Sequence, residues 1–352
     1  MKHPYEALPP KAFWRTAVAL KAWFEMEDIY RPKFDISPES KIATAGSCFA
    51  QHISRHLRMN GYDVLDCEPA PPGLGPARAR DYGYGLYSAR YGNIYVVRHL
   101  LQLLHEAWGE PTSGDLVWER DGRYFDAMRP NVEPEGLGSP EEVRLHRAQH
   151  LEKIRRLVLD MDTFIFTLGL TECWVHRTAG TVYPTCPGVI AGSFDSQTYA
   201  FKNFSHAELI SDFIACRDFI GQRRVEADLG GRLNPRFILT VSPVPLVATA
   251  SERHVLLATV YSKSVLRAVA GDLAQQYEDV AYFPSYEIVS APWSGHMYFE
   301  ANRRDVSQEG VDMVMDCFFA AHGRHAPVAP DIGLIEDEDA SCDEIILESL
   351  AR

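Results

Sequence analysis

Two adjacent side chains that can act as nucleophiles, Ser47 and Cys48, directly follow Gly46 in this sequence. A short apolar run over residues 42–45 comes before the glycine, and a helical pattern of apolar residues follows it. This order predicts a buried strand that passes into a helix at the carboxyl edge of a parallel sheet, where open α/β proteins bind ligands. The N–H groups of the helix N-terminus point at the same place. We therefore expect nucleophilic chemistry first at Ser47 and Cys48.

Both side chains also have simpler interpretations. A free cysteine is usually a small buried residue, so Cys48 could merely fill the seam between the helix and the sheet. Ser47 could act only as the N-cap of the following helix. In general, however, a cysteine at a helix N-terminus has a lowered pKa and reacts as the thiolate without a strong base. The sequence leaves these interpretations open.

Strand and helix patterns alternate along the chain. Apolar runs rich in β-branched and aromatic residues predict further strands at residues 62–65, 162–169, 236–241 and 280–284, with helical patterns between them. Alternation of this kind predicts a mostly parallel sheet covered by helices on both faces. We expect a three-layer α/β/α sandwich with about five parallel strands, of the flavodoxin-like type.

Local signals mark where several elements begin. Ser139, Ser205 and Ser307 each precede a helical pattern, and the first two have a glutamate three residues later, as in a capping box. Asp121-Gly122, within the aromatic segment 116–128, predicts a hairpin. These signals depend only on neighbouring residues, so they locate elements without any knowledge of the tertiary structure.

Polar residues follow the predicted strands at the edge where the cysteine is expected. Because the carboxyl ends of parallel strands meet at one edge, we expect these residues to lie close together. The candidates at strand ends are Thr171, Glu172, Ser242 and residues 285–287, and those on loops leaving the same edge are Asn93, His254, His296, Asn302 and Asp305. Nucleophilic catalysis needs a nucleophile, a base, a group that orients the base, and donors for an oxyanion. This set contains side chains for all four roles.

Composition limits the classes of partner. The chain has 352 residues and a formal net charge of −13, so nucleic acid and anionic membrane surfaces are poor partners. The seven cysteines show no Cys-x-x-Cys spacing, and the histidines on helical patterns lack the company of other ligands, so we expect no metal site. Scattered cysteines, an N-terminus without signal-peptide features and the absence of a long apolar window predict a cytoplasmic protein with no membrane span.

Three segments differ in composition. Residues 1–40 are rich in proline and aromatic residues, and we expect them to form an extension packed on the core. Residues 41–324 contain the alternating strand and helix patterns of a single α/β domain. Residues 325–352 are acidic with few aromatics, and we expect this tail to be disordered.

The segment Gly46-Ser47-Cys48-Phe49-Ala50 is the name-giving motif of the GSCFA domain family, which is related to the SGNH/GDSL hydrolases. The chain resembles that family over roughly residues 25–322. The resemblance extends to residues 88–95, 166–172, 186–188, 239–244, 261–264 and 282–287. It implies an SGNH-like version of the α/β/α fold.

The resemblance also implies roles for individual residues. The first superfamily block, Gly-Asp-Ser, matches residues 46–48, which puts Cys48 in the place of the nucleophile and Ser47 in that of the aspartate. The second block supplies an oxyanion-hole glycine, which Gly92 resembles, with Asn93 beside it. The oxyanion of an acyl-transfer intermediate would therefore meet donors from two separate segments.

The later blocks depart from the superfamily pattern. Thr171 stands where the oxyanion-hole asparagine is expected, and Glu172 follows it. The Asp-x-x-His block is best matched by Asn302-x-x-Asp305, so the histidine base of the superfamily is missing. A thiol needs less help from a base than a hydroxyl does, which favours Cys48 over Ser47.

Two histidines could replace the missing base. We rank His254, which follows the third central strand, before His296, and either Glu172 or Asp305 would orient the ring. Each residue has a structural alternative. His254 could be a loop histidine bonded to a carbonyl, His296 and Asp305 solvated surface residues, and Glu172 a charge that balances a helix dipole. Thr171, like Asn93, could be a turn residue only.

These implications lead to one functional hypothesis and one alternative. The hypothesis is an acyl-ester hydrolase or O-acyltransferase that acts on carbohydrate or cell-surface polymer precursors through Cys48 or Ser47. A cytoplasmic location favours an acyl-thioester donor such as acyl-CoA, and we expect no other cofactor. The alternative is a catalytically inactive SGNH-like domain that binds a glycan or a protein partner, and the missing Asp-x-x-His supports it.

Overall fold

A four-stranded parallel sheet with strand order β1-β4-β8-β9 forms the centre of the fold. Its strands are β1 (Ile42–Gly46), β4 (Thr163–Leu168), β8 (Arg236–Val241) and β9 (Val280–Phe283). The computed structural model describes residues 3–229, 235–325 and 347. All four strands run in the same direction, so their carboxyl ends lie at one edge.

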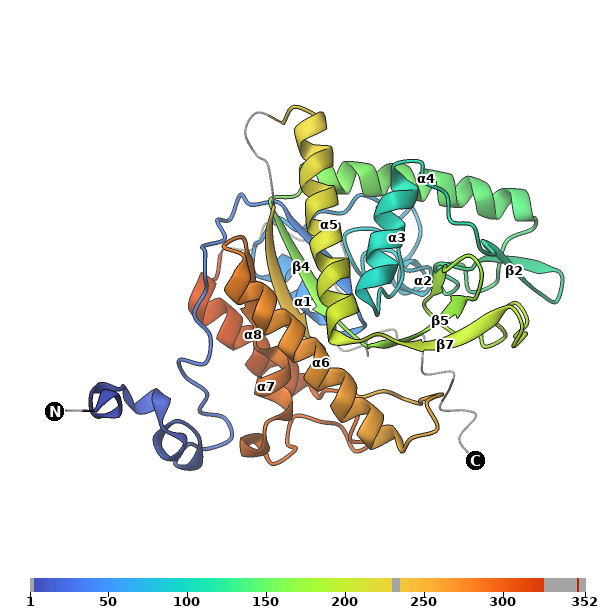
Figure 1. Cartoon of the computed structure of the whole chain (residues 1–352). Coiled ribbons are helices and arrows are strands. Elements are labelled where there is room, and N and C mark those ends of the chain that lie inside the picture. Colours follow the sequence, from blue (N-terminus) through green and yellow to red (C-terminus); the bar gives the residue numbers. More distant parts are fainter. Residues whose placement is uncertain (1–2, 230–234, 326–346, 348–352) are drawn as a thin grey trace.

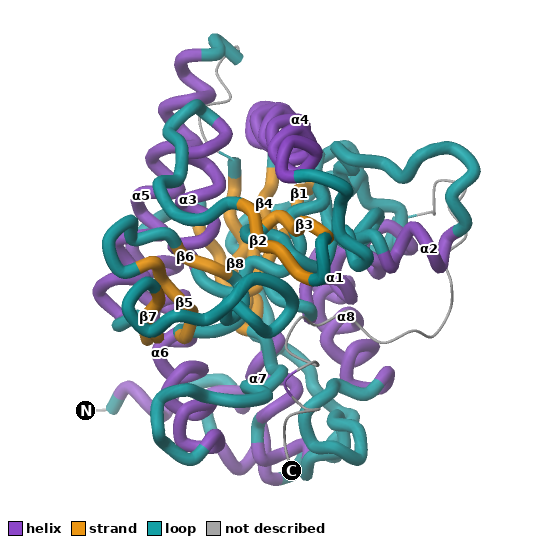
Figure 2. The backbone as a smooth tube through the Cα atoms, turned by 90° about the vertical axis from the view of Figure 1, so that its right-hand side faces the viewer, coloured by secondary structure: helices purple, strands orange, loops and turns teal. Residues whose placement is uncertain are grey.

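Helices cover both faces of this sheet (Figures 1 and 2). One face packs against α3 (Val97–Ala107), α4 (Pro140–Asp160), α5 (His206–Glu226) and α6 (Val255–Gln276). The other face packs against α1 (Phe49–Met59), α7 (Ser285–Ser290) and α8 (Gln308–His322). The predicted α/β/α class is therefore confirmed.

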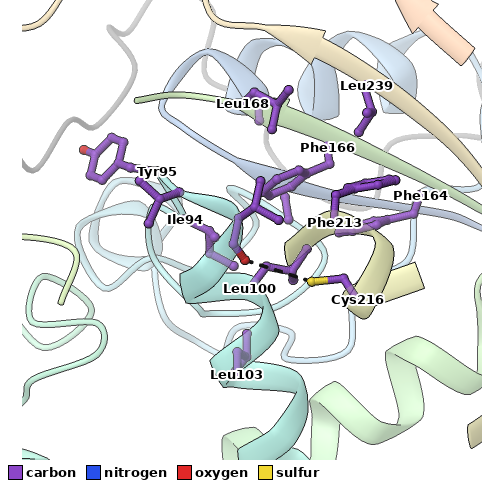
Figure 3. Close-up of a cluster of buried hydrophobic side chains, with 14 of the residues drawn as sticks. Ile94, Tyr95, Leu100, Leu103, Phe164, Phe166, Leu168, Phe213, Cys216 and Leu239 are labelled. Atoms are coloured by element: carbon purple, nitrogen blue, oxygen red, sulfur yellow. Dashed lines mark hydrogen bonds between the residues drawn. The ribbon is translucent and has the colours of Figure 1, made fainter. Parts of the chain in front are cut away.

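The core on the first face holds β4 in place (Figure 3). Every residue of β4 is buried, which fits a strand in the middle of a sheet covered on both sides. The rings of Phe164 and Phe166 stack with their centroids 5.7 Å apart. The thiol of Cys216 on α5 contacts the carbonyl of Val97 at 4.0 Å, so this cysteine contributes to packing (Figure 3). The turn at Gly169 thus follows a strand that the core holds firmly in place.

The element starts predicted from local signals are confirmed. Ser139, Ser205 and Ser307 are N-caps whose hydroxyls accept the N–H three residues later. The predicted hairpin pairs β2 (Val117–Arg120) with β3 (Arg123–Asp126). Both residues between them have positive φ, as a two-residue type I′ turn requires.

Tertiary structure changes other expectations. Residues 62–65 form no strand, and Val64 makes only an isolated parallel bridge with Ile42 at the edge of β1. Strand β9 stops at Phe283, one residue before the predicted end, and residues 285–287 follow it as the first turn of α7. The sequence analysis also missed an antiparallel sheet with order β6-β5-β7. Its strands are β5 (Glu172–His176), β6 (Val182–Tyr183) and β7 (Tyr199–Asn203).

The N-terminal segment has two parts. Its first part contains the short helices η1 (Pro4–Ala7), η2 (Pro10–Ala12) and η3 (Arg15–Ala19), none of which has a buried residue. This part projects from the body of the molecule (Figure 1, blue). Further along, Tyr30 and Ile36 are buried in the core beneath α8.

The remaining short helices are α2 (Pro76–Asp81), in the long loop before α3, and η4 (Pro292–Ser294), after α7. The acidic tail predicted for residues 325–352 lies almost entirely outside the described residues. Within the described ranges, no helix combines the length and the apolar character needed to cross a membrane.

Candidate active site

The turn after β1 depends on a glycine. Gly46 has φ of 135°, and a Cβ placed there would lie 2.3 Å from the carbonyl oxygen of Thr167 on β4. The N–H of Ser47 donates to the same oxygen at 3.2 Å. Only a residue without a side chain allows β1 to leave the sheet this close to β4. Gly46 therefore sets the position of the two nucleophile candidates.

Ser47 and Cys48 both lie beneath the molecular surface. Their exposed fractions are 3% and 5%. Cys48 is the N-cap residue of α1 but makes no side-chain capping bond. The hydroxyl of Ser47 is buried and has no hydrogen-bond partner among the described residues, so it does not cap α1 either. Of the simpler interpretations, the N-cap role of Ser47 is therefore wrong, while the burial expected of a packing cysteine is present.

The turn after β4 packs directly against Ser47. The N–H groups of Gly169 and Leu170 donate to the carbonyl of Tyr95 at 3.2 and 3.0 Å. A Cβ at Gly169 would lie 2.9 Å from Cβ of Ser47, so the glycine allows the two turns to touch. The ends of β1 and β4 thus form one continuous surface.

Helix α6 closes this surface from the other side. The N–H of Thr171 donates to the hydroxyl of Ser262 at 3.0 Å. Nζ of Lys263 donates to the carbonyl oxygen of Gly169 at 2.8 Å. The lysine is 1% exposed. Residues 261–264 belong to a segment that resembles the family, but none of them was predicted as a site residue. A lysine on a helix face that otherwise packs against a sheet is the signal that could have found Lys263.

A tyrosine joins the Ser47 turn to the loop that carries Gly92 and Asn93. The hydroxyl of Tyr87 donates to Oδ1 of Asn93 at 2.5 Å and lies 3.3 Å from the carbonyl of Ser47. Nε2 of Gln51 on α1 donates to the same hydroxyl at 3.0 Å. Since Oδ1 of Asn93 accepts, Nδ2 is the donor end of that amide. Tyr87 and Gln51 were not predicted, although Tyr87 directly precedes the family segment 88–95.

The backbone holds this loop beside the turn. The N–H of Ile94 donates to the carbonyl of Gly46 at 2.8 Å. Gly92 has φ of 67°, which favours glycine at that position. The structure therefore joins the turn of Ser47 to the loop that carries Gly92 and Asn93 and to the turn that leads to Thr171.

Glu172 and Ser242 lie in neighbouring turns. Oε1 of Glu172, at the start of β5, accepts a hydrogen bond from the hydroxyl of Thr249 at 2.9 Å. Burial raises the pKa of Glu172, while Thr249 and Arg253 act in the opposite direction. The hydroxyl of Ser242 is buried and accepts the N–H of Val244 at 3.3 Å. Glu172 thus contacts the loop that leads to His254.

His254 is an exposed residue at the start of α6. It is the N-cap, and its Nδ1 accepts the N–H of Leu256 at 3.1 Å. A neutral imidazole with an accepting Nδ1 carries its proton on Nε2. While this cap holds, the ring therefore has no nitrogen lone pair with which to take a further proton. His254 can act as a base only if the cap opens.

The cap function of His254 leads to a stability prediction. Replacing His254 with alanine should lower the free energy of unfolding by about 1 kcal/mol, because an orphan N–H of α6 loses its acceptor. His254→Asn, which keeps a capping acceptor, should remain within about 0.5 kcal/mol of the wild type. Urea unfolding followed by circular dichroism measures both. An alanine variant as stable as the wild type would contradict the assignment.

The remaining predicted residues form a separate group. Nδ2 of Asn302 donates to Oδ2 of Asp305 at 2.6 Å, and NH1 of Arg304 donates to Oδ1 of the same carboxylate at 2.8 Å. His296 is exposed and has φ of 66°. The hydrogen bonds of Asn302 and Asp305 therefore organise their own loop. Among the described residues, no cluster of three or more His, Cys, Asp or Glu side chains could hold a metal ion.

The fold and this site define an α/β/α protein with a nucleophile-bearing turn at the carboxyl edge of its parallel sheet. The model of the GSCFA family matches residues 41–318. The chain therefore belongs to the GSCFA family. Comparison with curated proteins and with solved structures finds no match.

Proposed function

We propose that this protein is an acyl-ester hydrolase or O-acyltransferase that acts on carbohydrate or cell-surface polymer precursors. The observation that carries the proposal is the Gly46-Ser47-Cys48 turn. It places two nucleophile-capable side chains at the carboxyl edge of the sheet and the N-terminus of α1. Ligands of open α/β sheets bind at this edge. The relation of this chain to the SGNH/GDSL hydrolases is part of the proposal.

In the proposed reaction, Cys48 (or Ser47) attacks the acyl carbon of an ester or thioester. The alcohol or thiol of the donor leaves with a proton, and the acyl group remains on the protein. Water then releases the acid, or an acceptor hydroxyl takes the acyl group. An acyl-thioester such as acyl-CoA would serve as donor, and the acceptor would be a glycan hydroxyl.

Donors for the developing oxyanion come from three segments. The backbone N–H of Cys48 and of Gly92 and the amide Nδ2 of Asn93 are the proposed donors. The contact between Tyr87 and Oδ1 of Asn93 supports the last of these, because it directs the acceptor end of the amide to the tyrosine. Thr171 would contribute its buried hydroxyl.

The sequence-based version of the proposal uses His254 as the base, oriented by Glu172 or Asp305. The capping bond of His254 limits this role to a state in which α6 is uncapped. His296, the second choice, is exposed.

Acylation is the direct test. The protein is incubated with p-nitrophenyl acetate or acetyl-CoA, and turnover and intact mass are measured. We expect one acetyl group on the wild type, and its loss in Cys48→Ala. Cys186→Ala is the matched control, because burial raises the pKa of this other cysteine to about 11 and it lies outside the turn. The absence of both turnover and adduct in the wild type would overturn the proposal.

A second candidate function is a binding module for a glycan or a protein partner. The low exposed fractions of Ser47 and Cys48, 3% and 5%, favour it, since an acyl donor has to reach these atoms. The same assay separates the two functions. A binding module shows neither turnover nor adduct, and Cys48→Ala leaves its behaviour unchanged.

A further inference from the structure

We propose that Lys263 activates the Ser47–Cys48 turn by supplying the positive charge against which Cys48 ionises. In this role the lysine takes the place of the histidine that the sequence lacks at position 305. The inference rests on the proposed function for the identity of the nucleophile. It assigns a protonation partner that the sequence analysis did not consider.

The first observation is the burial of a charged side chain. Lys263 is 1% exposed and belongs to the largest fully buried side chains of the described residues. An ammonium group removed from water costs several kcal/mol unless hydrogen bonds or an anion compensate it. Lysine is for this reason among the residues least often found in a protein interior. A chain that keeps one beside a nucleophile candidate gains an adaptable charge there.

The second observation is the hydrogen-bond acceptor of the Lys263 amine. Nζ donates to the carbonyl oxygen of Gly169, the first residue after β4. The neighbouring Ser262 accepts the N–H of Thr171, so two successive residues of α6 hold the same turn. Ser47 packs closely against Gly169. A Cβ added to Gly169 would lie 2.9 Å from the Cβ of Ser47. The amine of Lys263 and the side chain of Ser47 therefore both contact Gly169.

Arg58 of α1 reaches the Tyr87 loop only at the carbonyls of Gly85 and Tyr87. The other titratable groups named at this turn do not supply a positive charge. On α1, burial lowers the pKa of His52 to about 3, so its ring is neutral. Tyr87 and Tyr95, on the loop before α3, are phenols, which have no positively charged form in water. Glu172 at the start of β5 is an acid, and its ionised form would oppose a thiolate. We assign the positive charge to Lys263, which reaches the Gly169 turn from α6.

The proposed steps balance in protons and bonds. The thiolate of Cys48 attacks the acyl carbon, and the departing alkoxide or thiolate of the donor takes a proton from the Lys263 ammonium. The neutral amine next takes a proton from water or from an acceptor hydroxyl as that oxygen bonds to the acyl carbon. The Cys48 sulfur leaves as the thiolate, and the ammonium–thiolate pair is restored.

The ionisation of Cys48 tests this proposal without any substrate. Cysteine labelled with ¹³C at Cβ is followed by NMR as a function of pH, and Cys48→Ala identifies the signal of Cys48. We expect its midpoint below about 8.5, the ordinary value of a thiol. Lys263→Met should raise that midpoint by at least about one unit, a tenfold change in the ionisation constant. Lys263→Arg should keep it low, because the charge remains.

The result does not depend on every variant being folded. A wild-type midpoint at or above the ordinary value overturns the proposal even if Lys263→Met fails to fold. An unchanged midpoint in a folded Lys263→Met protein also overturns it. A low midpoint that rises in Lys263→Met supports it, whether or not the acylation assay succeeds. Failure of the proposed function has a different result. The midpoint of Cys48 is then low, but the acylation assay shows no acetyl adduct.

Discussion

Replacing Gly46 with alanine should lower the free energy of unfolding by more than about 4 kcal/mol, or prevent folding. A Cβ at this position would lie 2.3 Å from the carbonyl oxygen of Thr167 and 2.7 Å from its amide nitrogen. Both neighbours are backbone atoms of the central strand β4, which the packed core holds on both faces. Relief of the overlap would separate β1 from β4. The φ of 135° adds strain of about 1 kcal/mol for any residue with a side chain.

A second glycine provides the matched control. Gly73 also has a positive φ, 87°, but a Cβ there would meet nothing within 4 Å. Gly73→Ala should therefore show only the backbone strain, about 1 kcal/mol. Urea unfolding of the two variants and the wild type gives the comparison. Equal losses in both variants would mean that the contact with Thr167 is not what makes Gly46 necessary.

The second large effect is a loss of stability in acid. Between pH 7 and pH 5 the free energy of unfolding should fall by about 4 kcal/mol through two histidines that are buried in their neutral form. Burial, together with Arg147, lowers the pKa of His99 to about 3. Burial, together with Arg129, lowers the pKa of His150 to about 4, although Glu68 opposes this shift. Both side chains are almost fully buried, with exposed fractions of 3% and 0%.

The sign follows from proton uptake. An unfolded histidine binds its proton near pH 6.5, whereas these two remain neutral in the folded protein until pH 4 or below. The unfolded state therefore binds more protons between these values, and falling pH favours it. Each ring contributes about 2 kcal/mol at pH 5. The ring of His150 is neutral although it lies beside ionised Glu68, because burial and the charges of Arg129 and Arg147 lower its pKa.

Variants can isolate one of these histidines. His99→Gln should reduce the loss between pH 7 and pH 5 by about 2 kcal/mol, the contribution of one ring. His296→Gln is the control, because His296 is exposed. Urea unfolding at several pH values provides the slopes. A His99→Gln slope equal to that of the wild type would show that His99 titrates normally in the folded chain.

Several parts of the site could be located from neighbouring residues alone. The order of an apolar run, Gly46, two nucleophile candidates and a helical pattern correctly predicted a turn at the carboxyl end of a buried strand. Thr171 and Glu172 were placed at the same edge because they follow the predicted strand at residues 162–169. The physical basis is that burial periodicity and glycine punctuation act over a few residues, so they are visible in the linear sequence.

The ranking of the bases shows where such reasoning stops. His254 was chosen because it follows a central strand, and it does lie at the start of α6, but its Nδ1 is used by the helix cap. Asn302 and Asp305 were placed by alignment with a superfamily block, and the structure engages them with each other. The atoms that a side chain contacts depend on its rotamer and on segments distant in sequence. The spacing of residues along the chain gives no information about either.

The sequence by itself determined the layered α/β class, the helix starts at Ser139, Ser205 and Ser307, and the turn that carries Ser47 and Cys48. These depend on interactions between residues close in the chain. Only the tertiary structure decided that residues 62–65 contribute one bridge instead of a strand, and that both nucleophile candidates lie buried. It also brought Lys263 to the carbonyl of Gly169, across 94 residues of chain. Contacts over such separations form only when the whole core packs, because the entropy lost in closing the intervening chain has to be offset by burial elsewhere.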